Sequence, residues 1–202
     1  MLKKWFGPGR KEVWTQLANA TGAQFIPGSF WKGDKVEATH GEWTITLDTY
    51  TVSTGKSSTT YTRLRAPYIN PDGFRFTIYR ASIFSPIGKL LGMQDIEIGH
   101  ADFDRDFIIK ATDESKVRML LDEPQLRALI DAQPQIHLSA RDDEGYFGST
   151  FPPDADELVF QVHGVIKDIE RLKSLFDLFA ETLNQLCKIG SAYETAPDVT
   201  LK

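Results

Sequence analysis

An acidic stretch near the middle of the chain holds the densest group of side chains that could ligate a metal ion. Carboxylates and one imidazole recur there at nearly every second position: Asp95, Glu97, His100, Asp102, Asp104 and Asp106. On a β-strand alternate side chains share a face, so the last three carboxylates would project together and repel one another unless a cation, a lysine or water compensates. The spacing therefore predicts either a divalent-metal site, as in a metal-dependent hydrolase, or an edge strand whose acidic face is solvated and discourages pairing.

The same stretch matches a calcium-binding loop only in part. Asp102, Asp104 and Asp106 fit its first, third and fifth positions, and Asp113 fits its twelfth. The sixth position, where the sharp turn requires glycine, is Phe107, and the twelfth lacks the longer glutamate that binds calcium through both oxygens. The sequence therefore does not predict an EF-hand, and the metal-site hypothesis rests on the alternation alone.

A second group of residues suits an anionic ligand. Arginine and tyrosine alternate along two segments predicted to be strands, and the group consists of Tyr61, Arg63, Arg65, Arg75, Tyr79 and Arg80. Guanidinium groups bind carboxylates and phosphates through paired, charge-assisted hydrogen bonds. We expect these residues to form a sheet face that receives a small anionic molecule or an acidic segment of a partner protein. The alternative is a sheet face that is only solvated.

Motifs of the common catalytic and cofactor-binding sites are not found in the sequence. It has no nucleophile elbow, phosphate-binding loop or dinucleotide fingerprint, and its four histidines are scattered. Cys187, the single cysteine, follows Leu186 in an apolar helical pattern, where we expect a protonated and unreactive thiol. No cofactor is expected, and a non-catalytic binding or protein-interaction module is favoured over an enzyme.

The charge balance argues against nucleic acid as a partner. The 202 residues include 28 acidic and 23 basic side chains, for a formal net charge of −5, whereas nucleic-acid-binding proteins carry a basic patch or stripe. Hydrophobic residues make up 41% and charged residues 25% of the chain, as is typical of a globular protein. We expect no signal peptide and no transmembrane segment. The lack of a second cysteine fits a reducing compartment, so these features predict a cytoplasmic protein.

Hydrophobic periodicity predicts the elements that position both groups. Helical spacing covers 11–21 and ends at Gly22, and two shorter helices begin at the N-cap Asp113 and at Pro124. Two-residue alternation, typical of strands, recurs within 24–80, 95–99, 103–111, 135–141 and 158–166. The turns between the first strands are short, so we expect neighbours in sequence to pair as an antiparallel meander.

The longest helical pattern runs from Asp168, a predicted N-cap, to Gly190. Its apolar stripe is wide and consists of Ile169, Leu172, Leu175, Phe176, Leu178, Phe179, Leu183 and Leu186. A stripe of this width predicts a helix that covers a sheet, because burial of each such side chain contributes roughly 1.5–3 kcal/mol. Pairing with a helix of a partner is the alternative.

A family of bacterial proteins of unknown function is similar to this chain in two segments, GKLLGMQDIEIGHADFDRDFIIKATDESKVRMLL and VHGVIKDIERLKSLFDLFAETL. The likeness covers most of the chain and includes a glycine-rich turn at Gly88 and Gly92, the strand 103–110 and the final strand and helix. The resemblance implies a bacterial intracellular α+β domain and assigns no activity.

These patterns predict a single α+β domain over 1–202. Its antiparallel meander has about seven to nine strands, is covered by the long C-terminal helix, and is closed by the N-terminal and central helices. Residues 1–8 are expected to fray, 142–157 to form a mobile acidic loop, and 191–202 to form a tail. A homo-oligomer is compatible with this prediction.

Overall fold

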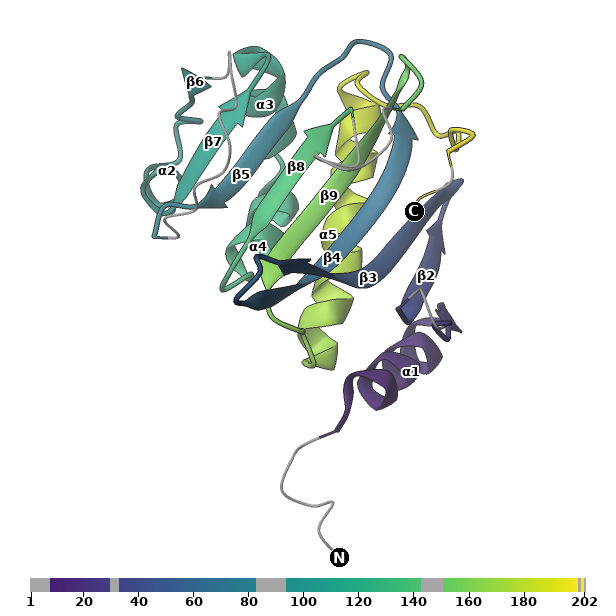
Figure 1. Cartoon of the computed structure of the whole chain (residues 1–202). Helices are drawn as coiled ribbons and strands as arrows, with labels where there is room; N and C mark the ends of the chain where they lie inside the picture. The colour runs from purple at the N-terminus through teal and green to yellow at the C-terminus, as the bar shows by residue number, and fades with distance from the viewer. Residues whose placement is uncertain (1–7, 30–32, 83–93, 143–150, 200, 202) are drawn as a thin grey trace, which may run out of the picture.

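The computed structural model describes residues 8–29, 33–82, 94–142, 151–199 and 201. These residues form one nine-stranded sheet with helices on one face, which confirms the predicted α+β domain (Figure 1). The strands are β1 (Gln24–Ile26), β2 (Lys35–His40), β3 (Trp43–Ser53), β4 (Ser58–Ile69), β5 (Phe76–Arg80), β6 (Gln94–Asp95), β7 (Phe107–Ala111), β8 (His137–Arg141) and β9 (Ala155–His163). The helices are α1 (Arg10–Thr21), α2 (Ala101–Asp106), α3 (Glu114–Leu121), α4 (Pro124–Asp131) and α5 (Ile169–Lys188).

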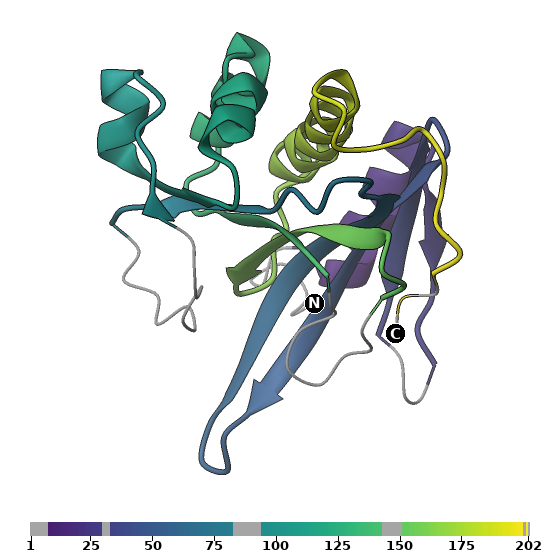
Figure 2. The ribbon, with the colours of Figure 1, turned by 90° about the horizontal axis from the view of Figure 1, so that it is seen from above.

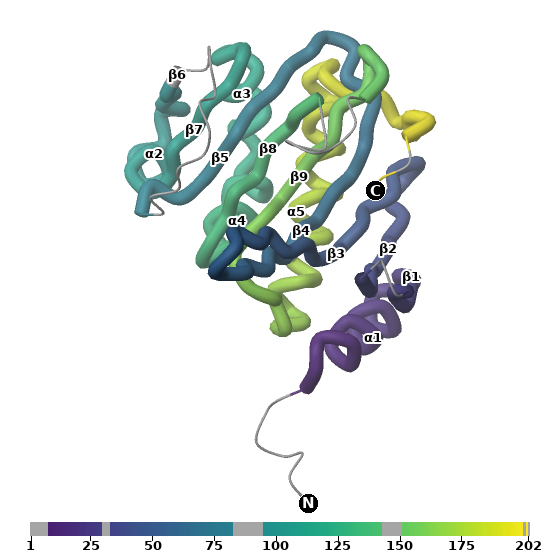
Figure 3. Tube along the Cα trace, in the orientation of Figure 1, coloured from purple at the N-terminus to yellow at the C-terminus, as the bar shows by residue number. Residues whose placement is uncertain are grey.

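The sheet is antiparallel, with the strand order β1-β2-β3-β4-β9-β8-β5-β7-β6. From β1 to β4 neighbours in sequence are neighbours in the sheet, as predicted. The order departs from a continuous meander between β4 and β5, because β9 and β8 lie between them. Figure 3 shows the chain leaving β4, crossing the end of the sheet and returning along β5.

The connection from β4 to β5 is a wide turn held by one side chain. Asn70 Nδ2 donates a hydrogen bond to the carbonyl oxygen of Phe74 (3.1 Å), and Asn70 Oδ1 accepts one from the backbone N–H of Gly73 (3.0 Å). Gly73 has a φ of 68°, in the region that favours glycine. This geometry closes the turn without bringing the two strands together, and it leaves the inner edge of β4 open for β9.

Caps and periodicity account for the predicted helices. Asp113 Oδ1 accepts a hydrogen bond from the backbone N–H of Lys116 (3.0 Å) at the start of α3, and Asp168 Oδ1 accepts one from that of Arg171 (3.0 Å) at the start of α5. Pro124 is the first residue of α4. These three helix starts, and α1 over the predicted 11–21, are confirmed.

The strand predicted over 103–111 is wrong in its first part. Residues 103–106 belong to α2, and β7 begins at Phe107. The cause is Asp104, whose two carboxylate oxygens accept hydrogen bonds from the backbone N–H groups of Ile98 (2.8 Å) and Gly99 (2.9 Å). These bonds fold the segment back on itself, and they also limit the strand predicted over 95–99 to β6.

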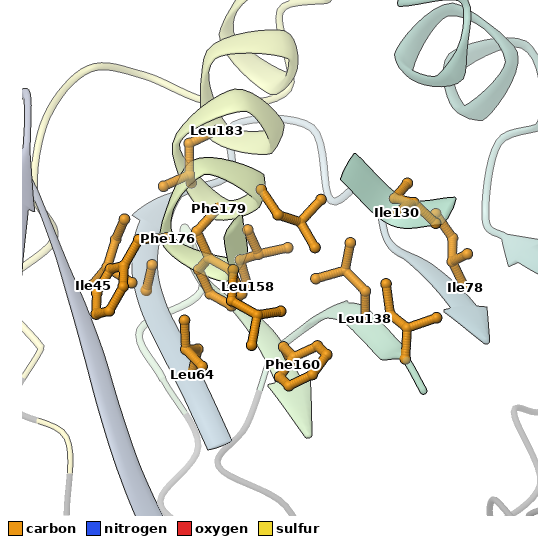
Figure 4. Packing of buried hydrophobic residues seen from close by; sticks show 14 of the residues in the cluster. Ile45, Leu64, Ile78, Ile130, Leu138, Leu158, Phe160, Phe176, Phe179 and Leu183 are labelled. Atoms are coloured by element: carbon orange, nitrogen blue, oxygen red, sulfur yellow. The ribbon is translucent and has the colours of Figure 1, made fainter. Parts of the chain in front are cut away.

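Helix α5 covers the centre of the sheet, as predicted. Figure 4 shows Phe176 and Phe179 pointing from α5 toward the strands, near Ile45, Leu64 and Leu158. Helix α1 packs against α5 and against β1 and β2. Figure 2 shows the helices above the sheet and the long β3–β4 hairpin extending on the other side.

Several expectations lie outside the described residues. These are the turn at Gly88 and Gly92, residues 1–7 of the expected frayed terminus, and 143–150 of the acidic loop expected over 142–157. The expected end of that loop is wrong, because Ala155, Asp156 and Glu157 are buried and begin β9.

Candidate functional site

A groove crosses the sheet face opposite α5, over β2, β3 and β4. The charged residues of its floor alternate with the buried core residues Val36, Leu47 and Leu64, so they point away from the helices. The volume of the groove is about 630 Å³, and its charged lining residues are Lys35, Glu37, Asp48, Arg63 and Arg65. We call it the cationic groove, because three cations face two carboxylates. Apolar side chains line part of its wall: Ile26, Pro27, Pro67, Val199 and Leu201.

Two arginines of β4 share one carboxylate in this groove. Arg63 donates from Nε to Asp48 Oδ1 and from Nη2 to Asp48 Oδ2, both at 2.8 Å, and Arg65 Nη2 donates to Asp48 Oδ2 at 2.9 Å. Burial disfavours the charged form of Arg63, but its hydrogen bonds to Asp48, together with the negative charges of Asp48 and Glu157, outweigh this effect and raise its pKa above the ordinary value. The site therefore holds two fixed guanidinium groups close together, with one carboxylate between them. The floor has a second ion pair, in which Lys35 Nζ lies 2.6 Å from Glu37 Oε1.

A polar network connects the groove to β9 and β8. The guanidinium of Arg63 lies 4.9 Å from the centroid of the Tyr50 ring, which stacks on Tyr61 at 5.1 Å. Tyr50 OH donates to Gln161 Oε1 (3.0 Å), and Gln161 Nε2 lies 3.1 Å from His137 Nδ1. An amide nitrogen only donates, so Nδ1 of His137 accepts and the proton of the neutral ring is on Nε2.

Glu157 adds a buried charge to the same face. Its side chain is 0% exposed, and Arg141 of β8 donates to Glu157 Oε1 from Nε (3.0 Å) and Nη2 (2.7 Å). Burial raises the pKa of Glu157, and Arg141 opposes that effect. Among the described residues, the second oxygen of Glu157 is buried without a hydrogen-bond partner.

We expect His137 to make the protein less stable by about 2 kcal/mol at pH 5 than at pH 7. Burial, together with the charge of Arg141, lowers the pKa of His137 to about 4 from the ordinary 6.5. Below about pH 6.5 the unfolded chain therefore binds a proton that the folded chain does not. The stability contributed by neutral His137 is present above the unfolded pKa and is lost as the pH falls toward the folded pKa.

Urea unfolding of the wild type and of His137→Gln at several pH values measures this effect. Glutamine keeps an acceptor for Gln161 but does not titrate, so the decrease in unfolding free energy between pH 7 and pH 5 should shrink in the variant. The other histidines and Glu157, whose raised pKa acts in the opposite direction, are present in both proteins. Equal pH slopes would show that His137 is not the cause.

The structure places three of the predicted anion-binding residues together. Tyr61, Arg63 and Arg65 lie on one face of β4, at the cationic groove or its edge. Tyr79 lies across β9 and β8 from them, on β5, where its ring centroid is 6.3 Å from that of His137.

Arg75, which precedes β5, and Arg80, the last residue of β5, bind other parts of the chain. Arg75 Nε donates to the buried Asp156 (3.0 Å), and Arg75 Nη1 pairs with Asp142 (2.9 Å). Arg80 donates to the carbonyl oxygens of Gln133 (2.8 Å) and Asp131 (2.6 Å), which follow or end α4. The expectation of one face that contains all six residues is therefore wrong for Arg75 and Arg80.

Six further residues of this face were not predicted from the sequence: Asp48, Tyr50, His137, Arg141, Glu157 and Gln161. Asp48 and Tyr50 alternate with Ile45 and Leu47 along β3, so a hairpin register for β3 and β4 would have found them. The other four lie on β8 and β9, and their position depends on strand pairing between distant parts of the chain.

The acidic stretch does not form the predicted alternating face, because part of it is helical. Asp102 and Asp106 both pair with Arg105 of the same helix, at 2.7 and 2.8 Å. Asp95 pairs with Lys110 on β7 at 3.1 Å. Glu97 and His100 are exposed, and Asp104 accepts the two backbone hydrogen bonds described above.

No three His, Cys, Asp or Glu side chains within the described part of the chain are grouped so that they could hold a metal ion. Metal binding by the acidic stretch stays a prediction. A thermal-shift titration with calcium, magnesium, manganese and zinc tests it, because an ion that binds only the folded state raises its stability.

We expect Asp104→Asn to destabilise the protein by about 1–2 kcal/mol, because asparagine has one acceptor oxygen for the two backbone N–H groups that the carboxylate binds. The free energy of unfolding in urea measures the change. Asp102→Asn is the matched control: Asp102 is exposed and only pairs with Arg105, so its loss should cost less than about 1 kcal/mol. Equal effects of the two substitutions would show that the hydrogen bonds of Asp104 with Ile98 and Gly99 do not stabilise the fold.

Comparison with known proteins gives one weak structural likeness. No protein-family model and no curated protein sequence matches the chain. Among solved structures, the mycobacterial trehalose monomycolate transport factor A, TtfA, is similar at a TM-score of 0.48 and 9% sequence identity, over 95% of this chain and 99% of that one. This degree of likeness assigns no function to the chain. None of the helices in the described ranges has the length and apolar content needed to cross a bilayer.

Proposed function

We propose that the protein is a non-catalytic binding module that takes an anionic ligand in the cationic groove. The observation that supports this most directly is the pair of guanidinium groups of Arg63 and Arg65 held on the single carboxylate of Asp48. The three arginines of this face, Arg63, Arg65 and Arg141, outnumber its two carboxylates, Asp48 and Glu157, so the face retains a net positive charge. A guanidinium pair suits the geometry of a carboxylate or phosphate.

Access to these groups differs between the two arginines. The Arg63 side chain is 14% exposed and lines the groove, whereas Arg65 is 3% exposed. We therefore assign the direct contact with the ligand to Arg63, and to Arg65 the role of adding positive charge beneath it. Because Asp48 fixes the Arg63 side chain, little side-chain entropy is lost when the ligand binds.

The rest of the lining offers contacts to both parts of such a ligand. The residues described at the groove include threonines and Ser29, whose hydroxyl groups can donate hydrogen bonds to a carboxylate or phosphate. The apolar wall of Ile26, Pro27, Val199 and Leu201 would contact an uncharged part of the ligand. The proposed ligand is thus a carboxylate or phosphate attached to a small apolar body, either a free molecule or an acidic protein segment.

Isothermal titration calorimetry with inorganic phosphate and with a short glutamate-rich peptide tests the proposal. The wild type should bind at least one of the probes in a saturable manner, and Arg63→Gln should weaken that binding by at least about tenfold, because a charge-assisted contact is lost. Arg118→Gln is the control, since Arg118 pairs with Glu114 on α3, away from the groove. Binding that is unchanged in Arg63→Gln, or no binding of either probe, would refute the proposal.

The proposal extends to the cellular context. We place the protein in the bacterial cytoplasm, as a member of the family that it resembles. The support is the sequence similarity described above and the single cysteine, which fits a reducing compartment.

A further inference from the structure

The floor of the cationic groove has two charged ends of different chemistry. Glu37 on β2, Thr46 on β3 and Arg65 on β4 lie opposite one another in register, so their side chains share the face that lines the groove. Neighbouring strands are about 4.8 Å apart, so Glu37 and Arg65 are separated by about 10 Å at the backbone. In this row only the short, uncharged side chain of Thr46 lies between the β2 end and the β4 end of the groove.

The carboxylate at the β4 end has both oxygens occupied. Asp48 accepts three hydrogen bonds, two from Arg63 and one from Arg65. A ligand that reaches this end therefore meets guanidinium groups rather than a free carboxylate. It must present an anion there, as the proposed function requires.

The carboxylate at the β2 end has acceptor capacity left. Among the described residues, Glu37 accepts a side-chain hydrogen bond only from Lys35 Nζ, at Oε1 (2.6 Å), whereas a carboxylate has about four acceptor sites. The side chains of Lys35 and Glu37 are 41% and 27% exposed. Exposed ion pairs of this kind are weak and involve mobile side chains, so a cationic group of a ligand can join Lys35 at Glu37 or replace it.

We propose that the ligand is zwitterionic, with an anionic group on Arg63 and an ammonium group, about 10 Å away, on Glu37. This inference rests on the proposed function and adds the second charged group of the same ligand. Opposite charges at the two ends of the groove also fix the direction in which the ligand lies, because the reversed ligand would place like charges together at both ends.

The wall of the groove suits an apolar connection between the two charges. Ile26 lies opposite Lys35 in register and is followed by Pro27, and Val199 and Leu201 line the groove with them. A chain of methylene groups buries apolar surface against these side chains. A peptide of similar length would place amide groups against side chains that offer no hydrogen bonds. The ligand class is thus an amino acid whose ammonium and acid groups lie at opposite ends of an apolar chain.

Isothermal titration calorimetry with matched probes tests this inference. The wild type should bind the eight-carbon ω-amino acid at least about fivefold more tightly than octanoate, because the ammonium group gains a charge-assisted contact with Glu37. A four-carbon ω-amino acid is too short to reach both ends and should show no such gain over butanoate. Triglycine separates its charges by a similar distance without an apolar chain, and it should bind more weakly than the eight-carbon ω-amino acid.

Glu37→Gln separates the two ends of the groove. This variant should bind octanoate at least as tightly as the wild type does, because Lys35 is released from its partner, but it should lose the preference for the ω-amino acid. Glu114→Gln is the control, since Glu114 pairs with Arg118 on α3, away from the groove. It should keep the full preference.

The results distinguish this inference from the anion-binding proposal. A wild type that binds octanoate but gains nothing from the ammonium group, or a preference that survives in Glu37→Gln, would overturn the zwitterionic ligand and leave anion binding intact. Triglycine that binds more tightly than the eight-carbon ω-amino acid would overturn the apolar connection. A wild type that binds none of the probes would refute both proposals.

Discussion

Phe179→Ala is expected to destabilise the protein by about 3–5 kcal/mol, which is a large share of the about 5–15 kcal/mol that stabilises a typical native protein. Phe179 is 0% exposed and points from α5 onto the sheet beside Leu158 (Figure 4). Truncation removes the burial of the ring and leaves a cavity that the surrounding strands cannot close fully. Denaturant unfolding monitored by circular dichroism measures the loss.

Lys173→Ala is the control on the same helix. Lys173 pairs only with the exposed Glu170, one turn from the cap of α5, so its loss should cost less than about 1 kcal/mol. A helix that served mainly as a seam for a partner would behave differently. Phe179→Ala would then abolish association in light scattering and leave a cooperative unfolding transition of nearly unchanged midpoint, and that result would contradict the role of α5 as the cover of the core.

Arg141→Met is expected to destabilise the protein by about 3 kcal/mol at neutral pH, because it leaves the fully buried carboxylate of Glu157 without its hydrogen-bonding partner. The value is at the lower end for a broken buried ion pair, since Arg63 and Arg65 also attract Glu157. Burial already raises the pKa of Glu157. A carboxyl group with a raised folded pKa binds a proton more readily in the folded state, so the loss should diminish as the pH falls.

Two further variants distinguish the loss of the Arg141–Glu157 ion pair from the loss of an arginine side chain alone. The double variant Arg141→Met with Glu157→Gln should be more stable than Arg141→Met alone, because no unpaired charge remains. Arg118→Met removes an arginine from an exposed pair with Glu114 and should cost less than about 1 kcal/mol. Losses that simply add in the double variant would contradict an interaction between Arg141 and Glu157.

Local signals in the sequence predict the helices and the type of sheet. The caps Asp113 and Asp168 each bind the backbone N–H group three residues later, so a few adjacent residues are enough to predict where each helix begins. The apolar stripe of α5 likewise needs only the helical period. The positions of β8 and β9 do not follow from such signals, because the pairing of Leu64 with Phe160 depends on segments far apart in the chain.

The candidate site is predictable to the extent that it lies on one hairpin. Arg63 and Arg65 alternate with buried residues along β4, and this alternation indicates their common face. The ion pair of Glu157 with Arg141 arises only when β8 and β9 meet. The prediction for the acidic stretch fails for a different reason. The alternation of Asp102, Asp104 and Asp106 is typical of a strand, but Asp104 accepts two hydrogen bonds from the preceding backbone N–H groups, and these bonds stabilise a helical turn instead.

The placement of β9 and β8 between β4 and β5 determines the order in which the fold can assemble. Strands β1 to β4 pair with their sequence neighbours, so their contacts are local and form early. The inner edge of β4 pairs with β9 (Ala155–His163), which is synthesised well after β1 to β4. We therefore expect the β8–β9 pair to join the sheet last, between its two other parts. The rate of this long-range closure should then determine how long the open edge of β4 is exposed to aggregation.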